Sequence, residues 1–90
     1  MKESAVQKKI IDYLHSVGAW TVKTIQCNKA GVPDILACYK GKFIALEVKR
    51  DSKSIVSTLQ KRTIKQIQRA KGISAVVTSV EEVKDILDRI

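Results

Sequence analysis

The chain has 90 residues, of which 44% are hydrophobic and 29% are charged, and its formal net charge is +8. This length suits one small domain, so we expect residues 1–90 to form a single domain with a thin core. No apolar run approaches the roughly 18 residues of a membrane-spanning helix, and no signal peptide pattern is present. The two cysteines form neither a Cys-x-x-Cys pair nor a cluster with histidine, which argues against a zinc site or a disulfide framework. We therefore expect a cytoplasmic protein with reduced thiols.

The predicted helices cover residues 3–17, 56–71 and 80–90. Apolar residues recur at helical spacing in each of them, and a glycine follows the first two. Ser79 can cap the third helix, with Glu82 at the capping-box position. The side of the second helix that we expect to face the core contains Leu59, Thr63, Ile64, Ile67 and Ala70.

The predicted strands cover residues 19–26, 34–39, 43–50 and 73–79. The second and third are separated by a short glycine-containing link, which predicts an antiparallel hairpin. Cys38 lies inside the second strand and is expected to be a small core residue. The nearly continuous apolar run FIALEV predicts a central strand covered on both faces, and a carboxylate inside it, Glu47, needs an explanation. The predicted order is α-β-β-β-α-β-α, an α/β fold.

Strand geometry brings three charged side chains together. Glu47 and Lys49 project from the same face because side chains alternate along a strand. Asp34 and Glu47 are equally distant from the centre of the hairpin turn, so an antiparallel register places them opposite each other. Two facing carboxylates repel unless a cation lies between them, and Mg²⁺ or Mn²⁺ suits such an all-oxygen site. Taken singly, Asp34 could be a turn residue, and Glu47 and Lys49 a surface ion pair.

The distribution of charge indicates a polyanionic partner. Residues 1–79 contain 15 Lys and Arg against 5 Asp and Glu, whereas residues 80–90 contain 2 against 4. The strong excess of basic residues in positions 1–79 favours nucleic acid as the partner. Charge that serves only solubility would give a similar composition.

The sequence Gly31-Val32-Pro33-Asp34, followed by Glu47-Val48-Lys49-Arg50, resembles the PD-(D/E)xK nuclease superfamily. More narrowly, it resembles a stand-alone, phage-type member of the virus-type replication-repair nuclease family, VRR-NUC. Similar residues fall along almost the whole chain, including GVPDILAC, GKFIALEVKR, the Leu59-Gln60 pair and TSVEEV. The resemblance implies a restriction-endonuclease-like core, in which helices flank a mixed sheet.

The resemblance also implies roles for particular residues. The implied metal ligands for Mg²⁺ or Mn²⁺ are Glu3, Asp34, Glu47 and the backbone carbonyl of Val48. The implied catalytic residues are Asp34, Glu47, Lys49 and Gln60. Lys49 would either activate the attacking water or stabilise the transition state, and Gln60 would hydrogen-bond Lys49 or the scissile phosphate. Without the resemblance, Glu3 would be a favourable charge at a helix start and Gln60 a solvated helix residue.

The implied function is a metal-dependent DNA endonuclease, selective for DNA structure in the manner of Holliday-junction resolvases, acting in replication, recombination or repair. Candidate DNA contacts are Lys29, Arg50, Lys53, Lys61 and Arg62. Cutting a four-way junction symmetrically would require a homodimer. The expected setting is the cytoplasm of a bacterial or phage-infected cell. The alternatives are a non-catalytic basic module that binds nucleic acid through a nuclease-like fold, and a small protein whose basic face binds an acidic partner.

Overall fold

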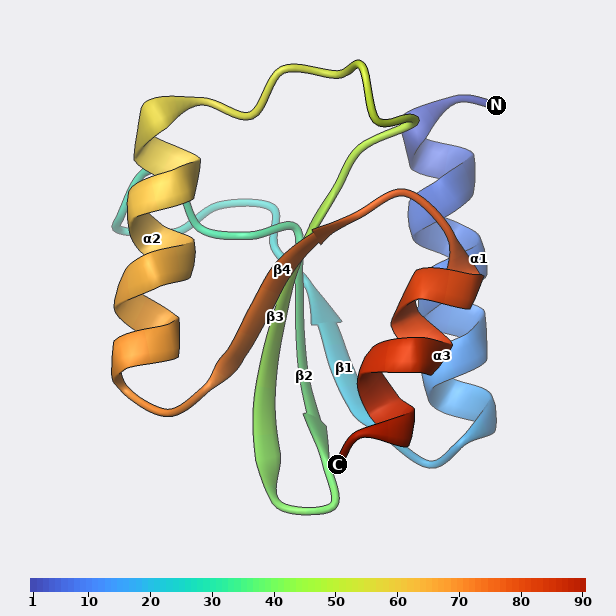
Figure 1. Ribbon diagram of the computed structural model, residues 1–90. Helices are drawn as coiled ribbons and strands as arrows, with labels where there is room; N and C mark the ends of the chain where they lie inside the picture. The colour runs from blue at the N-terminus through green and yellow to red at the C-terminus, as the bar shows by residue number, and fades with distance from the viewer.

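The computed structural model describes all 90 residues and contains three helices and a four-stranded sheet (Figure 1). The elements are α1 (Glu3–Ser16), β1 (Trp20–Lys23), β2 (Ile35–Tyr39), β3 (Lys42–Val48), α2 (Thr58–Arg69), β4 (Ile73–Val77) and α3 (Val80–Asp88). This is the predicted α-β-β-β-α-β-α order, and the α/β fold is confirmed. Figure 1 shows α2 on one face of the sheet and α1 with α3 on the other. None of the helices has the length and apolar character that a membrane span needs.

The sheet is mixed and has the strand order β1-β2-β3-β4. The pairs β1–β2 and β2–β3 are antiparallel, whereas β3 and β4 run parallel. Lys40 and Gly41 form the predicted hairpin turn, and both have positive φ, 50° and 78°. Two such residues give a turn whose twist matches that of the flanking strands. The first strand is shorter than the predicted 19–26, since it ends at Lys23.

The main core lies between the sheet and the pair α1 and α3. It contains Val6, Ile10, Leu14, Ala19, Ile35, Ala37, Ile44, Leu46, Val48, Val77, Val83 and Leu87. Residues 44–48 of β3 are all buried, because alternate residues face this core and the remaining ones face the α2 side. The prediction that this strand is central and covered on both faces is therefore confirmed.

The opposite face of the sheet is only partly covered. The helix α2 packs mainly against β4 and β3 and leaves much of that face of β1 and β2 open. Three predictions were therefore wrong, because Cys38 on β2 and Leu59 and Ala70 on α2 are exposed rather than in a core. The register places Cys38 between Trp20 and Phe43 on this open face, where all three side chains are exposed.

The start of α3 differs in detail from the predicted capping box. Ser79 caps the helix, since its hydroxyl accepts a hydrogen bond from the Glu82 N–H at 3.2 Å. The Glu82 carboxylate, however, accepts from the N–H of Thr78 at 2.7 Å, one residue before the cap. In a complete capping box the Glu82 carboxylate would accept from the N–H of Ser79, and here the N–H of Thr78 takes that place.

Candidate metal centre

Asp34 lies immediately before β2 and is fixed at both its backbone and its side chain. The hairpin pairs Ile35 with Leu46, so the next position along the register sets Asp34 against Glu47. This is the pairing predicted from their equal distances to the centre of the turn. The N–H of Val48 donates to Asp34 Oδ2 at 2.9 Å. On the other side, the N–H of Thr24 donates to the Asp34 carbonyl at 2.9 Å.

Thr24 has a positioning role that the sequence alone did not reveal. Its hydroxyl donates to the carbonyl of Pro33 at 2.9 Å, in addition to its backbone bond to Asp34. Both bonds tie the segment before β2 to the end of β1. A threonine just beyond a short edge strand has no distinctive sequence signal, because its partners are 9 and 10 residues away.

Glu47 is a buried carboxylate with two different oxygens. Its side chain is 2% exposed, and Oε2 accepts a hydrogen bond from Gln60 Nε2 at 2.9 Å. Lys49 Nζ lies 3.3 Å from the same Oε2, and the lysine side chain is only 13% exposed. Oε1 is buried without any hydrogen-bond partner. Because an unsatisfied buried oxygen of this kind is costly, Oε1 is suited to receive a proton or a cation.

The environment of Glu47 favours its neutral form. Burial away from water is the largest effect, and together with the negative charge of Asp34 it raises the pKa of Glu47 from 4.5 to about 7. Lys49 opposes this change through its charge and its contact with the carboxylate. A divalent cation beside Glu47 would act in the same direction as Lys49 and favour the ionised carboxylate.

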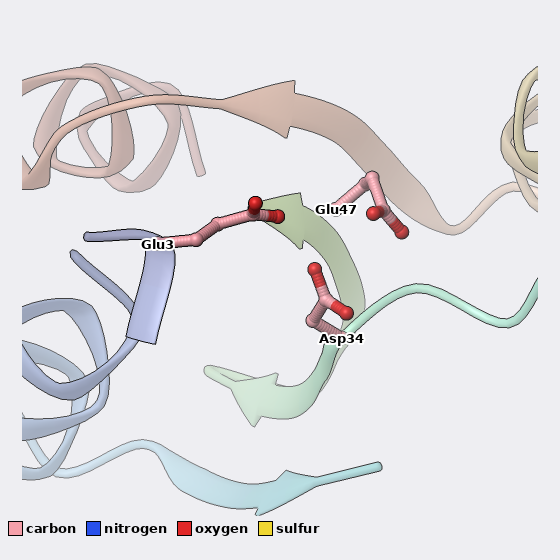
Figure 2. Close-up of side chains that lie close together, drawn as sticks. All are labelled: Glu3, Asp34 and Glu47. Carbon is pink, nitrogen blue, oxygen red and sulfur yellow. The ribbon is translucent and has the colours of Figure 1, made fainter. Parts of the chain in front are cut away.

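Glu3 completes a cluster of three carboxylates. It belongs to the first turn of α1, and Figure 2 shows its side chain extending toward the carboxylates of Asp34 and Glu47. Glu3, Asp34 and Glu47 each offer one oxygen, and these oxygens lie within 4.8 Å of one another. This hard-oxygen donor set, with the unpartnered Oε1 of Glu47, fits a divalent cation such as Mg²⁺ or Mn²⁺. The N–H of Val48 is part of the site, whereas its carbonyl as a ligand stays a prediction.

In the free protein Gln60 contacts Glu47, a partner that was not predicted from the sequence, and its contact with the scissile phosphate stays a prediction. Its amide nitrogen donates to Glu47 at 2.9 Å, and its Oε1, the atom that could accept from Lys49, accepts instead from the N–H of Ser57 at 3.0 Å. The Ser57 hydroxyl in turn accepts from the N–H of Gln60 at 3.1 Å, which completes a capping box at the start of α2. The Ser-x-x-Gln spacing was a usable signal for this arrangement. It would have placed the helix start at Thr58 instead of residue 56.

The five candidate DNA contacts do not line one common hollow. Lys61 and Arg62 lie on the outer face of α2, where Lys65 and Arg69 also line a shallow hollow of about 540 Å³. Lys29 and Arg62 line a groove between α2 and the sheet. Arg50 lies beside the start of α1, paired with Asp51 at 3.6 Å. Lys53 is exposed on the link that crosses from β3 to α2.

Two solved structures are similar to this chain over nearly its whole length. One, described as "VRR_NUC domain", has 25% sequence identity and a TM-score of 0.84, and the match covers 98% of this chain and 96% of that one. The other, described as "VRR_NUC domain protein", has 16% identity and a TM-score of 0.78, with coverages of 99% and 87%. At 16% identity the second shows the fold alone. No family model and no curated protein matches the sequence. The resemblance carried by the motifs around Asp34 and Glu47 is thus confirmed by structure, and the chain has the VRR_NUC nuclease fold, which supports the VRR-NUC family and a nuclease-like domain.

Proposed function

We propose that this protein is a metal-dependent DNA endonuclease whose centre is formed by Glu3, Asp34 and Glu47. The observation that carries the proposal is the state of Glu47, a 2%-exposed carboxylate with one oxygen fixed by Gln60 and Lys49 and the other without a partner. A core that needed only packing would gain nothing from a buried acid beside a second acid, because both charges lose their hydration. A divalent cation accounts for the whole cluster.

The residues around the carboxylates have separable tasks in this proposal. Mg²⁺ or Mn²⁺ held by the three acids would supply Lewis acidity toward a phosphoryl oxygen. Lys49 lies beside Glu47, where its ammonium can orient the attacking water or stabilise negative charge on the phosphate. Gln60 fixes the rotamer of Glu47 through a bond of 2.9 Å. It is thus a positioning residue in the free protein.

The proposed substrate is DNA recognised by its backbone and its shape. The nuclease-like fold supports a nucleic-acid substrate, and the net charge of +8 supports phosphate contacts. A domain of 90 residues offers little surface for reading base edges, so selectivity would rest on DNA structure. Lys29, Arg50, Lys53, Lys61 and Arg62 are the proposed DNA contacts.

A homodimer acting on four-way junctions extends this proposal. Its support is the resemblance and the two almost fully exposed aliphatic side chains, Ile25 and Ile55, which a second copy would cover. Sedimentation of the free protein and of its complex with a junction tests it, and a monomer in both samples would contradict it. The cytoplasmic setting stays a prediction from the sequence, and the phage setting stays one from the resemblance.

The proposed function is tested by incubating the protein with single-stranded, duplex, flap and four-way-junction DNAs in Mg²⁺, Mn²⁺ or EDTA, and mapping the cuts. We expect cleavage in either metal, none in EDTA, and a preference for a branched substrate. Salt-sensitive binding without cleavage in any metal would instead indicate a non-catalytic DNA-binding module. Weak binding that ignores salt would favour a protein partner.

A further inference from the structure

A groove on the α2 side of the sheet has the chemistry of a site for an unpaired nucleotide. It holds about 590 Å³ and runs between α2, the face of β2 and β3, and the loop that precedes Asp34. Seven of its twelve lining residues are apolar, and none is an Asp or a Glu. The charged residues are Lys29 and Arg62. An apolar interior with cations beside it suits a ligand that is flat and apolar at one end and anionic at the other.

The groove adjoins the carboxylate cluster. Its lining includes Pro33 and Leu59, which immediately precede Asp34 and Gln60 in the chain. The loop is held against α2 at Gly31, where φ is +77° and a Cβ atom would come within 2.8 Å of Leu59 Cγ. Only glycine allows that approach. A strand occupying the groove would therefore pass beside the residues that hold Asp34 and Glu47.

Phe43 supplies a stacking surface inside the groove. Its side chain is 47% exposed, although β3 is otherwise buried from Ile44 to Val48. It also lines a second hollow of about 420 Å³ at the hairpin end, together with Lys42 and Lys71. Phe43 thus lines two hollows, each with two basic residues and no acid. Alternating cations and an aromatic face are the features by which proteins bind single-stranded nucleic acid.

We infer that this groove binds an unpaired DNA strand next to the cleavage site, with a base stacked on Phe43 and phosphates on Lys29, Arg62, Lys42 and Lys71. The inference rests on the proposed nuclease function and deepens it, since it assigns the substrate unpaired nucleotides beside the cut. A second copy presenting the same groove is less suited, because it would bring cations against cations. Selectivity for branched DNA then follows, because bases at a branch point can unpair and enter the groove beside the cut.

The test compares two DNAs with the same number of phosphates. Both are duplexes with a single-stranded overhang, and in one of them the overhang residues lack bases. Binding is measured in EDTA, so the result does not depend on cleavage. We expect the intact overhang to bind at least about five-fold more tightly, which is the lower end of what one base–aromatic stack contributes. Equal affinities for the two DNAs would overturn the inference.

Variants connect the preference to the groove. Phe43→Ala should remove most of the difference between the two DNAs, and Ala70→Phe should do the same by filling the groove from an exposed position on α2. Trp20→Ala is the matched control, because Trp20 is an exposed aromatic on the same sheet face that does not line the groove. Melting temperatures check that each variant is folded.

Two further results separate this inference from the nuclease proposal. A base preference in EDTA without cleavage in Mn²⁺ would support the groove site while contradicting the nuclease. Cleavage without any base preference would support the nuclease proposal and contradict the groove site. If Phe43→Ala converts a dimer to a monomer in sedimentation and leaves the base preference intact, the groove is a protein interface and the inference is wrong.

Discussion

The amide nitrogen of Gln60 lies 2.9 Å from Oε2 of Glu47, and so links the first turn of α2 to the centre of the sheet. The same side chain accepts a hydrogen bond from Ser57 and completes the cap of its helix. One residue therefore fixes both the start of α2 and the orientation of the buried carboxylate. This double role allows stability and activity to be separated by mutation.

We predict that Gln60→Ala and Ser57→Ala both weaken the cap of α2 but differ in activity. Each removes part of the capping box, at a cost of about 1 kcal/mol, or about 4–8 °C in melting temperature for a domain of this size. Only Gln60→Ala also removes the hydrogen bond to Oε2 of Glu47, so it alone should lower the affinity for Mn²⁺ or the cleavage rate. Thermal melts, calorimetry and a cleavage assay provide the three readouts. Equal loss of activity in both variants would reduce Gln60 to a helix cap.

Lys49→Met should lower turnover by about 100-fold or more, while the affinity for Mn²⁺ changes by only a few-fold. The ammonium lies 3.3 Å from Glu47 and carries no lone pair for a metal when protonated, so its loss removes charge stabilisation rather than a ligand. Single-turnover cleavage and metal titration measure the two effects separately. Loss of metal affinity with turnover intact at saturating metal would refute this role.

Glu3→Gln should weaken Mn²⁺ binding by about ten-fold, since one carboxylate of three is neutralised at the oxygen cluster. Glu81→Gln is the matched control, because Glu81 is also an acid in a first helical turn but belongs to α3. Both variants lose a favourable helix-end charge of about 0.3–1 kcal/mol. If calorimetry gives the two variants the same metal affinity, Glu3 is only a helix-end charge.

The metal-free protein should become less stable as pH rises from 4.5 to 7. The pKa of Glu47 is raised to about 7 in the fold, so its protonated form contributes stability that is complete below pH 4.5 and is lost as pH passes through 7. Glu47→Gln lacks this titration, so the wild-type melting temperature should fall relative to that variant across the window.

Added Mn²⁺ should reverse this loss, because metal binding requires the ionised carboxylate and stabilises the folded state. The increase in melting temperature on adding Mn²⁺ should therefore be larger at pH 7.5 than at pH 5. A difference between wild type and Glu47→Gln that does not vary with pH would contradict the shifted pKa.

The sequence was sufficient for the element order and for the convergence of Asp34 and Glu47. Both depend on local patterns, namely apolar periodicity, a short glycine-containing link between two strands and the register that such a link imposes. Leu59, Ala70 and Cys38 were placed wrongly because periodicity shows that a face is apolar without showing whether another element covers it. The helix α2 covers only part of its sheet face, and that is a property of packing.

The hydrogen-bond partners of the site residues could not be predicted from the sequence either. The contact between Gln60 and Glu47 spans 13 residues, and that between Thr24 and Pro33 spans 9, so each depends on how elements pack. Glu3 could be placed in the site only through the resemblance. In the sequence it is indistinguishable from any acid at the start of a helix.

Cleavage of a four-way junction in Mn²⁺ by wild type and by Asp34→Asn tests the metal centre most directly. The substitution keeps the side-chain shape and leaves an oxygen that can accept from the Val48 N–H, but removes the charge beside Glu47. We predict cleavage by the wild type, its loss by at least about 100-fold in Asp34→Asn, and unchanged junction binding by both in EDTA. Cleavage by Asp34→Asn at the wild-type rate, or equal cleavage by the wild type in EDTA and in Mn²⁺, would contradict the assignment of a metal-dependent nuclease.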